Sequence, residues 1–255
     1  MSKIKIIRSW WGSDKDKFSE IPNAPLFIHE VVYVWGKDNY KILSKRGYTC
    51  YLMEDDEFDN DTVYGKKLQV LDKALKHWRE VLMLDWDCHI LKPLDSKFDA
   101  MLRLKETQVP LYIHHKKPKE KLLEAIPKDH PSNIKLISKF LDLVELEIPK
   151  YNWPWDEGLV IPNFGCVYSS NINLGSDLIK IAKDNNIKGL VEEFAMWKYA
   201  NCSMEEYIEK FLPNYVLGVS NQKLEYTNHT ICKLQRKFNE YITNKINYKP
   251  YLEHV

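Results

Sequence analysis

The sequence lacks the features that mark several common protein classes. It has no stretch of the roughly 18–20 consecutive apolar residues that a membrane-spanning helix needs, so we expect no membrane span. Its 37 basic and 36 acidic residues leave a net charge of +1, without the basic excess of a nucleic-acid-binding domain, so no nucleic-acid partner is expected. The motifs GxxxxGKS/T and GxGxxG do not occur, which argues against a P-loop kinase and a dinucleotide-dependent enzyme.

Cysteine is scarce. The five cysteines are widely spaced, odd in number and without a CxxC pair, so neither a disulfide framework nor a structural zinc site is expected. Residues 1–8 are too short and too interrupted by polar residues to form a secretory signal peptide. Together these observations predict a reducing, cytoplasmic setting.

The remaining composition is that of a globular protein, with 44% apolar and 29% charged residues. The length of 255 residues suits one large domain, and no repeat or linker divides the chain. We therefore predict a single domain over residues 1–255. The 15 Tyr, 9 Phe and 8 Trp supply rings that can stack on bases or sugars, although most are expected in the core.

Strands and helices alternate in the first 95 residues. Residues 30–35 are β-branched and aromatic, which predicts a strand. Apolar residues recur at helical spacing between residues 63 and 77. Further strands are expected at residues 3–8, 49–53 and 81–84, and a further helix at 37–46. This alternation predicts an α/β fold with a mainly parallel central sheet flanked by helices.

The second half of the chain is less regular. We expect strand segments within residues 109–115, 158–169 and 215–219, and helices at 134–144, 176–187, 190–200 and 204–211. The tail from residue 229 onward is polar and rich in Lys and Tyr.

Two carboxylates, Asp85 and Asp87, follow the apolar run 81–84, which suits a strand buried on both faces. They are expected at the carboxyl edge of a parallel sheet, where open α/β folds bind ligands. Neighbouring anions raise each other's pKa, and a divalent cation would compensate them; hard oxygen ligands suit Mn²⁺ or Mg²⁺. The alternative is a polar turn that ends a strand.

Residues 73–95, KALKHWREVLMLDWDCHILKPLD, resemble the core of the GT-A nucleotide-sugar glycosyltransferases, where a helix and an apolar strand deliver a DxD motif. The resemblance implies a GT-A fold with a Rossmann-like nucleotide-binding half (1–95) and an acceptor half and tail (96–255). It implies that Asp85 and Trp86 contact the donor, and that Asp85 and Asp87 are metal ligands, with Asp87 on the ion that bridges the diphosphate.

The same resemblance implies further donor contacts. Lys67 matches a donor-contacting Lys of glycogenin-like members, although its spacing to the DxD motif is two residues longer here. Asn163 matches the Asn of an "fNsGv" strand entry that approaches the donor sugar. The loop 9–13 follows the first strand and meets the nucleoside in GT-A folds, which makes Ser9, Trp10 and Trp11 candidate contacts. The alternatives are a solvated lysine for Lys67 and a turn before a core strand for Asn163.

Acceptor-side carboxylates are expected from Glu192 and Glu193, which resemble an acidic pair that opens a helix beside the sugar, and from Asp156 in a tryptophan-rich loop. In an inverting enzyme a carboxylate would deprotonate the acceptor hydroxyl. The sequence does not decide between inversion and retention of the anomeric configuration. Acids at a helix N-terminus are also stabilised by the helix dipole without any catalytic role. The resemblance implies a C-terminal histidine as a further metal ligand, which would be His229 or, alternatively, His254; a third interpretation is that neither histidine binds the metal.

The sequence thus predicts a hexosyl-type, metal-dependent glycosyltransferase that moves a sugar from a nucleotide-sugar, UDP-sugar favoured, to a glycan or other hydroxyl acceptor. In the absence of a membrane anchor we expect a cytoplasmic enzyme, bacterial or, if viral, in the host cytoplasm. A haloacid-dehalogenase-type phosphatase would use Asp85 as nucleophile, but His89 stands where that motif has Thr. A non-catalytic carbohydrate-binding protein would explain the aromatic residues but not the paired carboxylates.

Overall fold

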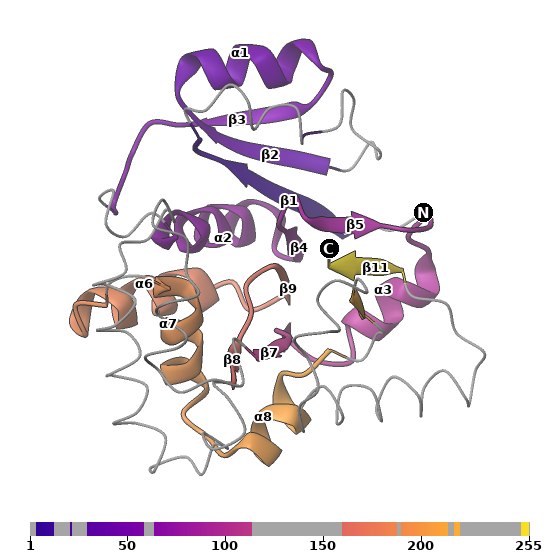
Figure 1. The fold of residues 1–255 in the computed structure, drawn as a ribbon, viewed down its shortest axis with the longest axis vertical. Coiled ribbons are helices and arrows are strands. Elements are labelled where there is room, and N and C mark those ends of the chain that lie inside the picture. Colours follow the sequence, from indigo (N-terminus) through magenta and orange to yellow (C-terminus); the bar gives the residue numbers. More distant parts are fainter. Residues whose placement is uncertain are drawn as a thin grey trace.

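The computed structural model describes residues 4–12, 21, 30–58, 64–113, 160–187, 190–213, 217–219 and 251–254. Its centre is a six-stranded sheet in the order β3-β2-β1-β4-β9-β6 (Figure 1). The strands are β1 (Lys5–Trp10), β2 (Glu30–Trp35), β3 (Thr49–Met53), β4 (Val81–Leu84), β6 (Thr107–Gln108) and β9 (Cys166–Ser169). The first four pair in parallel, whereas β9 runs antiparallel to both β4 and β6. The predicted α/β class with a mainly parallel sheet is confirmed.

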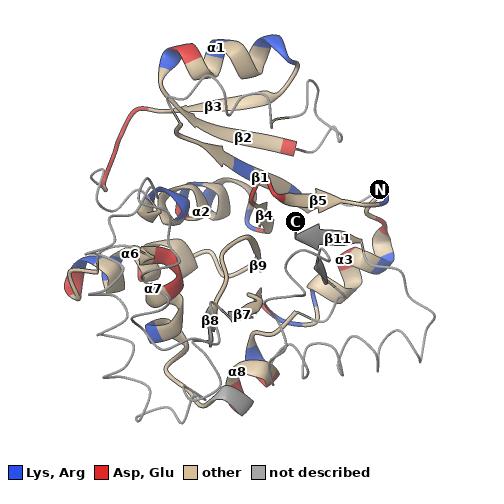
Figure 2. Ribbon diagram, in the orientation of Figure 1, with Lys and Arg blue, Asp and Glu red and all other residues tan. Residues whose placement is uncertain are grey.

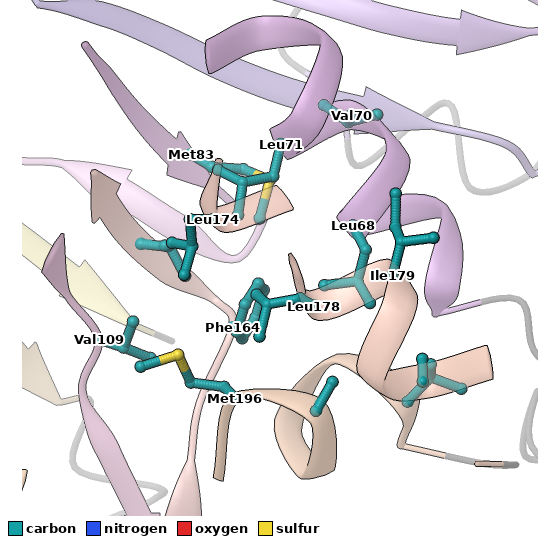
Figure 3. Close-up of a cluster of buried hydrophobic side chains, with 14 of the residues drawn as sticks. Leu68, Val70, Leu71, Met83, Val109, Phe164, Leu174, Leu178, Ile179 and Met196 are labelled. Atoms are coloured by element: carbon teal, nitrogen blue, oxygen red, sulfur yellow. The ribbon is translucent and has the colours of Figure 1, made fainter. Parts of the chain in front are cut away.

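Helices cover both faces of this sheet. Helix α1 (Lys37–Lys45) lies on one face, while α2 (Gly65–Trp78), α6 (Leu174–Asp184) and α7 (Val191–Ala200) lie on the other (Figure 1). The alternation of β2 explains this: Val32 and Val34 pack with Leu43 of α1, whereas Val31 and Tyr33 join the larger core. That core brings Leu68 and Leu71 of α2 against residues of β4, α6 and α7 (Figure 3).

Two small sheets and two short helices complete the described fold. Strand β5 (Cys88–Ile90) follows β4 after one turn and pairs with β11 (Leu252–His254), which also pairs with β10 (Leu217–Val219). Strands β7 (Leu111–Ile113) and β8 (Val160–Pro162) form a separate pair. The short helices are α3 (Ser96–Leu102) and α8 (Met204–Lys210). None of the helices among these residues is long and apolar enough to cross a membrane.

Strands β2, β3 and β4 have the predicted bounds, and the prediction for the first strand needs correction. The first strand extends through Trp10, which pairs with Val34, so Ser9 and Trp10 belong to β1 and not to the loop after it. The strand segment expected within 109–115 is β7, whereas β6, which ends before Pro110, was not predicted. Strand β11, which lies in the polar tail, was not predicted, and neither were β5 and α3. The helix expected at 134–144 lies outside the described residues.

Candidate functional site

The site lies at the carboxyl edge of the central sheet, where β4 ends and Asp85 follows. Because β9 runs antiparallel to β4, it begins at this same edge, with Cys166 opposite Leu84. The backbone N–H of Asp85 therefore donates to the Gly165 carbonyl at 2.8 Å. The Gly165 N–H donates to Oδ1 of Asn163 at 2.8 Å, which closes the turn that enters β9. The structure thus places Asn163 near Asp85, with its side-chain oxygen engaged in that turn.

Three ionisable side chains from three parts of the fold meet at this edge. Lys67 lies in the first turn of α2, and its Nζ donates to Oδ2 of Asp85 at 2.6 Å. The same Nζ lies 3.6 Å from Oε1 of Glu192, in the first turn of α7. The side chains of Lys67 and Glu192 are 9% and 2% exposed, whereas that of Asp85 is 28% exposed. Figure 2 shows basic residues on α2 and acidic residues on α7 on the same side of the sheet.

Burial sets the protonation states in this cluster. Burial, together with the neighbouring Glu193, raises the pKa of Glu192 to about 8 against the opposing effect of the Lys67 cation. For Lys67, burial opposes the charged form, but the neighbouring Asp85, which also accepts its hydrogen bond, and Glu192 more than compensate and raise its pKa. Lys67 is therefore a cation and Glu192 is mostly protonated at neutral pH. Oε2 of Glu192 has no hydrogen-bond partner within the described part of the chain.

The turn between β4 and β5 carries the predicted DxD motif. Trp86 donates from Nε1 to the Ser9 carbonyl at 2.8 Å, and its ring meets those of Trp10 and Tyr48 edge-on, with centroids 6.3 and 5.8 Å apart. Trp10 is itself only 9% exposed. Trp10 and Trp86 are therefore packed against each other at the end of β1, whereas Asp87 is exposed.

Trp11 has a different environment from Trp10. It is half-buried, and its ring meets that of Trp35 at the end of β2, with centroids 6.2 Å apart. Nζ of Lys66 lies 5.1 Å from the Trp35 ring centroid. Sequence reasoning singled out neither Trp35 nor Lys66, although the position of Trp35 at the carboxyl end of a predicted strand was a usable signal.

The carboxylates of Asp85 and Asp87 fit a metal site whose remaining ligands come from a nucleotide and water. No group of three or more His, Cys, Asp or Glu residues that could hold an ion occurs among the residues whose placement is described. Mg²⁺ bound with nucleotides is held by one or two carboxylates, and phosphates and water complete its shell, so Asp85 and Asp87 suffice for that arrangement. The β11 register places His254 opposite Cys88, one residue beyond Asp87.

Of three further predicted site residues, the structure describes only Glu193. Glu193 is buried beside Glu192 in the first turn of α7. Asp156 and His229 lie outside the described residues. Sequence reasoning also missed Arg8, a buried cation that contacts the DxD turn from β1.

No protein-family model matches the chain, and no curated protein matches it. Solved structures do. The WbbM bifunctional glycosyltransferase aligns at a TM-score of 0.50 and 11% identity over 98% of this chain and 45% of that one. Mouse xyloside xylosyltransferase 1 aligns at 0.48 and 11% identity, over 99% and 97% of the two chains. GlyE of Streptococcus pneumoniae TIGR4 aligns at 0.43 and 13% identity, over 98% and 54%. The chain spans less than half the length of WbbM, and this likeness shows that it shares the fold of a glycosyltransferase structure.

Proposed function

We propose that the chain is a GT-A-type glycosyltransferase that takes a metal-bound nucleotide-sugar donor, preferably a UDP-sugar, and transfers a hexose to a hydroxyl acceptor such as a glycan. The observation that carries this proposal is the cluster of Lys67, Asp85 and Glu192 at the carboxyl edge of the sheet. Open α/β sheets bind ligands at this edge. The fold shared with WbbM supports the same activity.

The donor side of the site would be held by the DxD turn. Asp85 and Asp87 would hold Mn²⁺ or Mg²⁺, which supplies electrostatic stabilisation of the leaving diphosphate when it is bound. Lys67 orients Asp85 through their 2.6 Å hydrogen bond and contributes positive charge to a site for an anion. The candidate third ligands are His254, whose backbone pairs with Cys88 next to Asp87, and His229.

Glu192 is the favoured acceptor-side carboxylate. A general base works best when its pKa lies near the operating pH, and burial raises the pKa of Glu192 to about 8. Its Oε2 is buried and accepts no hydrogen bond from the described residues, so a hydroxyl that entered the site would meet an unsatisfied acceptor. Glu193 and Asp156 are the remaining candidates for this role. The anomeric configuration of the product would decide between inversion and retention.

Nucleotide binding tests this function directly. Calorimetric titration with UDP, GDP, CMP and dTDP, each with and without Mn²⁺, should give binding that requires the metal, strongest for UDP. Asp87→Asn should weaken that binding at least about ten-fold, or about 1.4 kcal/mol, without unfolding the protein. Asp38→Asn is the matched control, because Asp38 is exposed on α1 and its side chain is 93% accessible.

Two results would contradict the proposal. One is an absence of metal-dependent binding of any of the four nucleotides to the wild-type protein. The other is a folded Asp87→Asn protein that binds the preferred nucleotide with metal as tightly as the control does.

A further inference from the structure

Arg8 is a buried cation that the proposed donor and acceptor roles do not use. It lies on β1 and is 4% exposed. Arginine is almost never this buried unless its charge is paired, so the groups that Arg8 contacts indicate its role.

The guanidinium of Arg8 joins two parts of the fold. Its Nε donates to Oε1 of Glu30, the first residue of β2, which is also 4% exposed. Its Nη1 donates to the Asp85 carbonyl, and its Nη2 donates to the Cys88 carbonyl at 3.2 Å. One rigid, planar fork thus spans a carboxylate on the neighbouring strand and both ends of the DxD turn.

The rest of the turn is held from the same strand. The Cys88 N–H donates to the Asp85 carbonyl at 3.0 Å, so this carbonyl accepts from Arg8 and from the turn itself. The guanidinium carbon of Arg8 lies 5.0 Å from the centroid of the Trp86 ring, and Trp86 donates to the carbonyl of Ser9 at 2.8 Å. The contacts from β1 thus fix the backbone of residues 85 and 88 and the ring of residue 86, while the Asp87 side chain is exposed.

We propose that Arg8 is a positioning residue: Glu30 holds its guanidinium in place, and the guanidinium fixes the 85–88 turn so that the carboxylates of Asp85 and Asp87 are preorganised for a metal-bound diphosphate. The ligand in this statement rests on the proposed function, whereas the restraint on the turn does not. Arg8→Lys keeps the positive charge, but a single ammonium group cannot donate to Glu30 and to the carbonyls of Asp85 and Cys88 with the geometry of the guanidinium. Preorganisation of ligating groups by their supporting contacts typically changes metal affinity 10–100-fold.

The chain offers a matched control for this substitution. Arg103 donates to both carboxylate oxygens of Glu80, from Nε at 2.6 Å and from Nη2 at 2.8 Å, in a pair that does not involve the turn. Arg8→Lys and Arg103→Lys therefore make the same chemical change in two Arg–Glu pairs. Glu30→Gln is a milder variant, because it keeps an oxygen acceptor for Nε of Arg8 and leaves its hydrogen bonds to the turn possible.

The first readout needs no ligand. Amide hydrogen exchange in the segment 85–88 should be at least about ten-fold faster in Arg8→Lys, with a smaller increase in Glu30→Gln and none in Arg103→Lys, after correction for global stability. If Arg8→Lys does not fold, Glu30→Gln carries this test alone. Unchanged exchange in this segment in the folded variants would overturn the proposal, whether or not the protein binds a nucleotide.

The second readout concerns Mn²⁺-dependent UDP binding. Arg8→Lys should weaken it about 10–100-fold, and Arg103→Lys should leave it unchanged. In the double variant with Asp87→Asn, the loss should be much smaller than the product of the two single losses, because Arg8 acts through the turn that presents Asp87. Independent losses that multiply would indicate a merely structural role and overturn the proposal. A wild-type protein that binds no nucleotide would contradict the proposed function. The hydrogen-exchange result would still decide whether Arg8 restrains the 85–88 turn.

Discussion

At the scale of single residues, the site depends on a balance between burial and charge. A buried ion without a partner is costly, and Lys67 meets this cost by lying between Asp85 and Glu192. The two acidic side chains that Lys67 contacts differ in burial, because that of Asp85 is 28% exposed and that of Glu192 is 2% exposed. Lys67 lies closer to the more exposed Asp85 than to Glu192, and burial keeps Glu192 mostly protonated. The arrangement therefore places a buried, mostly protonated carboxyl group beside the Lys67 cation.

The raised pKa of Glu192 predicts a pH-dependent stability. Burial raises it from 4.5 to about 8, in surroundings that contain Lys67, Glu193, Asp85 and Tyr64. Between these values the folded state holds a proton that the unfolded chain has released, so the free energy of unfolding falls as the pH rises from about 4.5 to about 8. Glu192→Gln should flatten this decline in urea unfolding measured across that range.

The control for this prediction is Glu209→Gln, which alters an exposed glutamate on α8. It should keep the wild-type dependence on pH. Equal slopes for Glu192→Gln and the wild type would show that Glu192 does not retain its proton in the folded protein.

The two neighbouring tryptophans of β1 and its following loop should respond differently to truncation. Trp10 is 9% exposed and packs with Trp86, so Trp10→Ala should cost about 3–5 kcal/mol of stability. Trp11 is half-buried, and its loss should mainly weaken nucleotide binding, by about ten-fold or more, if the ring stacks on the base. Urea unfolding and calorimetry of both variants measure the two effects. Normal nucleotide affinity in Trp11→Ala would assign its ring to packing against Trp35.

At the scale of elements, the positions of α2 and α6 determine where Lys67 stands. The two helices approach closely at Gly175, where an added Cβ would lie 2.3 Å from the Cα and 2.4 Å from the backbone N of Asp72. Real Cβ atoms essentially never come so near to backbone, so only glycine allows this helix crossing. The acidic residues 54–57 add ion pairs to the same helices, from Asp56 to Lys66 and from Glu57 to Lys183.

Gly175→Ala should therefore destabilise the protein. Alanine favours a helix over glycine by about 1 kcal/mol, but forcing the backbones of α2 and α6 apart typically costs about 1–3 kcal/mol and occasionally more. We expect a net loss in urea unfolding, with the solvent-exposed Lys180→Ala on the same helix close to wild type. A Gly175→Ala protein as stable as the wild type would show that the two helices are not in close contact.

At the scale of the whole molecule, the central sheet draws strands from both halves of the chain. Strand β9, from the second half, pairs with β4 through Leu82 opposite Tyr168. Tyr168 is 1% exposed and donates from its hydroxyl to Oε1 of Glu80 at 2.8 Å. The halves assigned to nucleotide and acceptor thus share a ladder, and the prediction of a single domain can be tested through it.

We expect one cooperative unfolding transition. Far-UV circular dichroism and tryptophan fluorescence should give the same urea midpoint, because loss of the β4–β9 ladder removes the support of both halves. Tyr168→Ala should lower both midpoints together, at a cost of about 3–5 kcal/mol. Separate midpoints, or a shift in only one probe, would indicate two independently folding units.

The sequence by itself determined the bounds of β2, β3 and β4 and the placement of Asp85 and Asp87 after a buried strand. It could do so because β-branched runs and apolar stretches are local signals of strand structure, and the carboxyl end of a parallel strand follows from the strand's direction. The periodicity of α2 was equally local, although it did not say which face Lys67 would occupy.

Only the tertiary structure decided which of these residues meet. The antiparallel insertion of β9, the pairing of β5 with β11, the approach of Glu192 to Lys67 and the fork of Arg8 all join segments far apart in the chain. Such contacts depend on strand register and on the packing of helices over the sheet, which local periodicity does not encode. The buried cation Arg8 on β1 shows this most directly. Its guanidinium donates to the Glu30 carboxylate on β2, to the Asp85 carbonyl in the turn after β4 and to the Cys88 carbonyl at the start of β5.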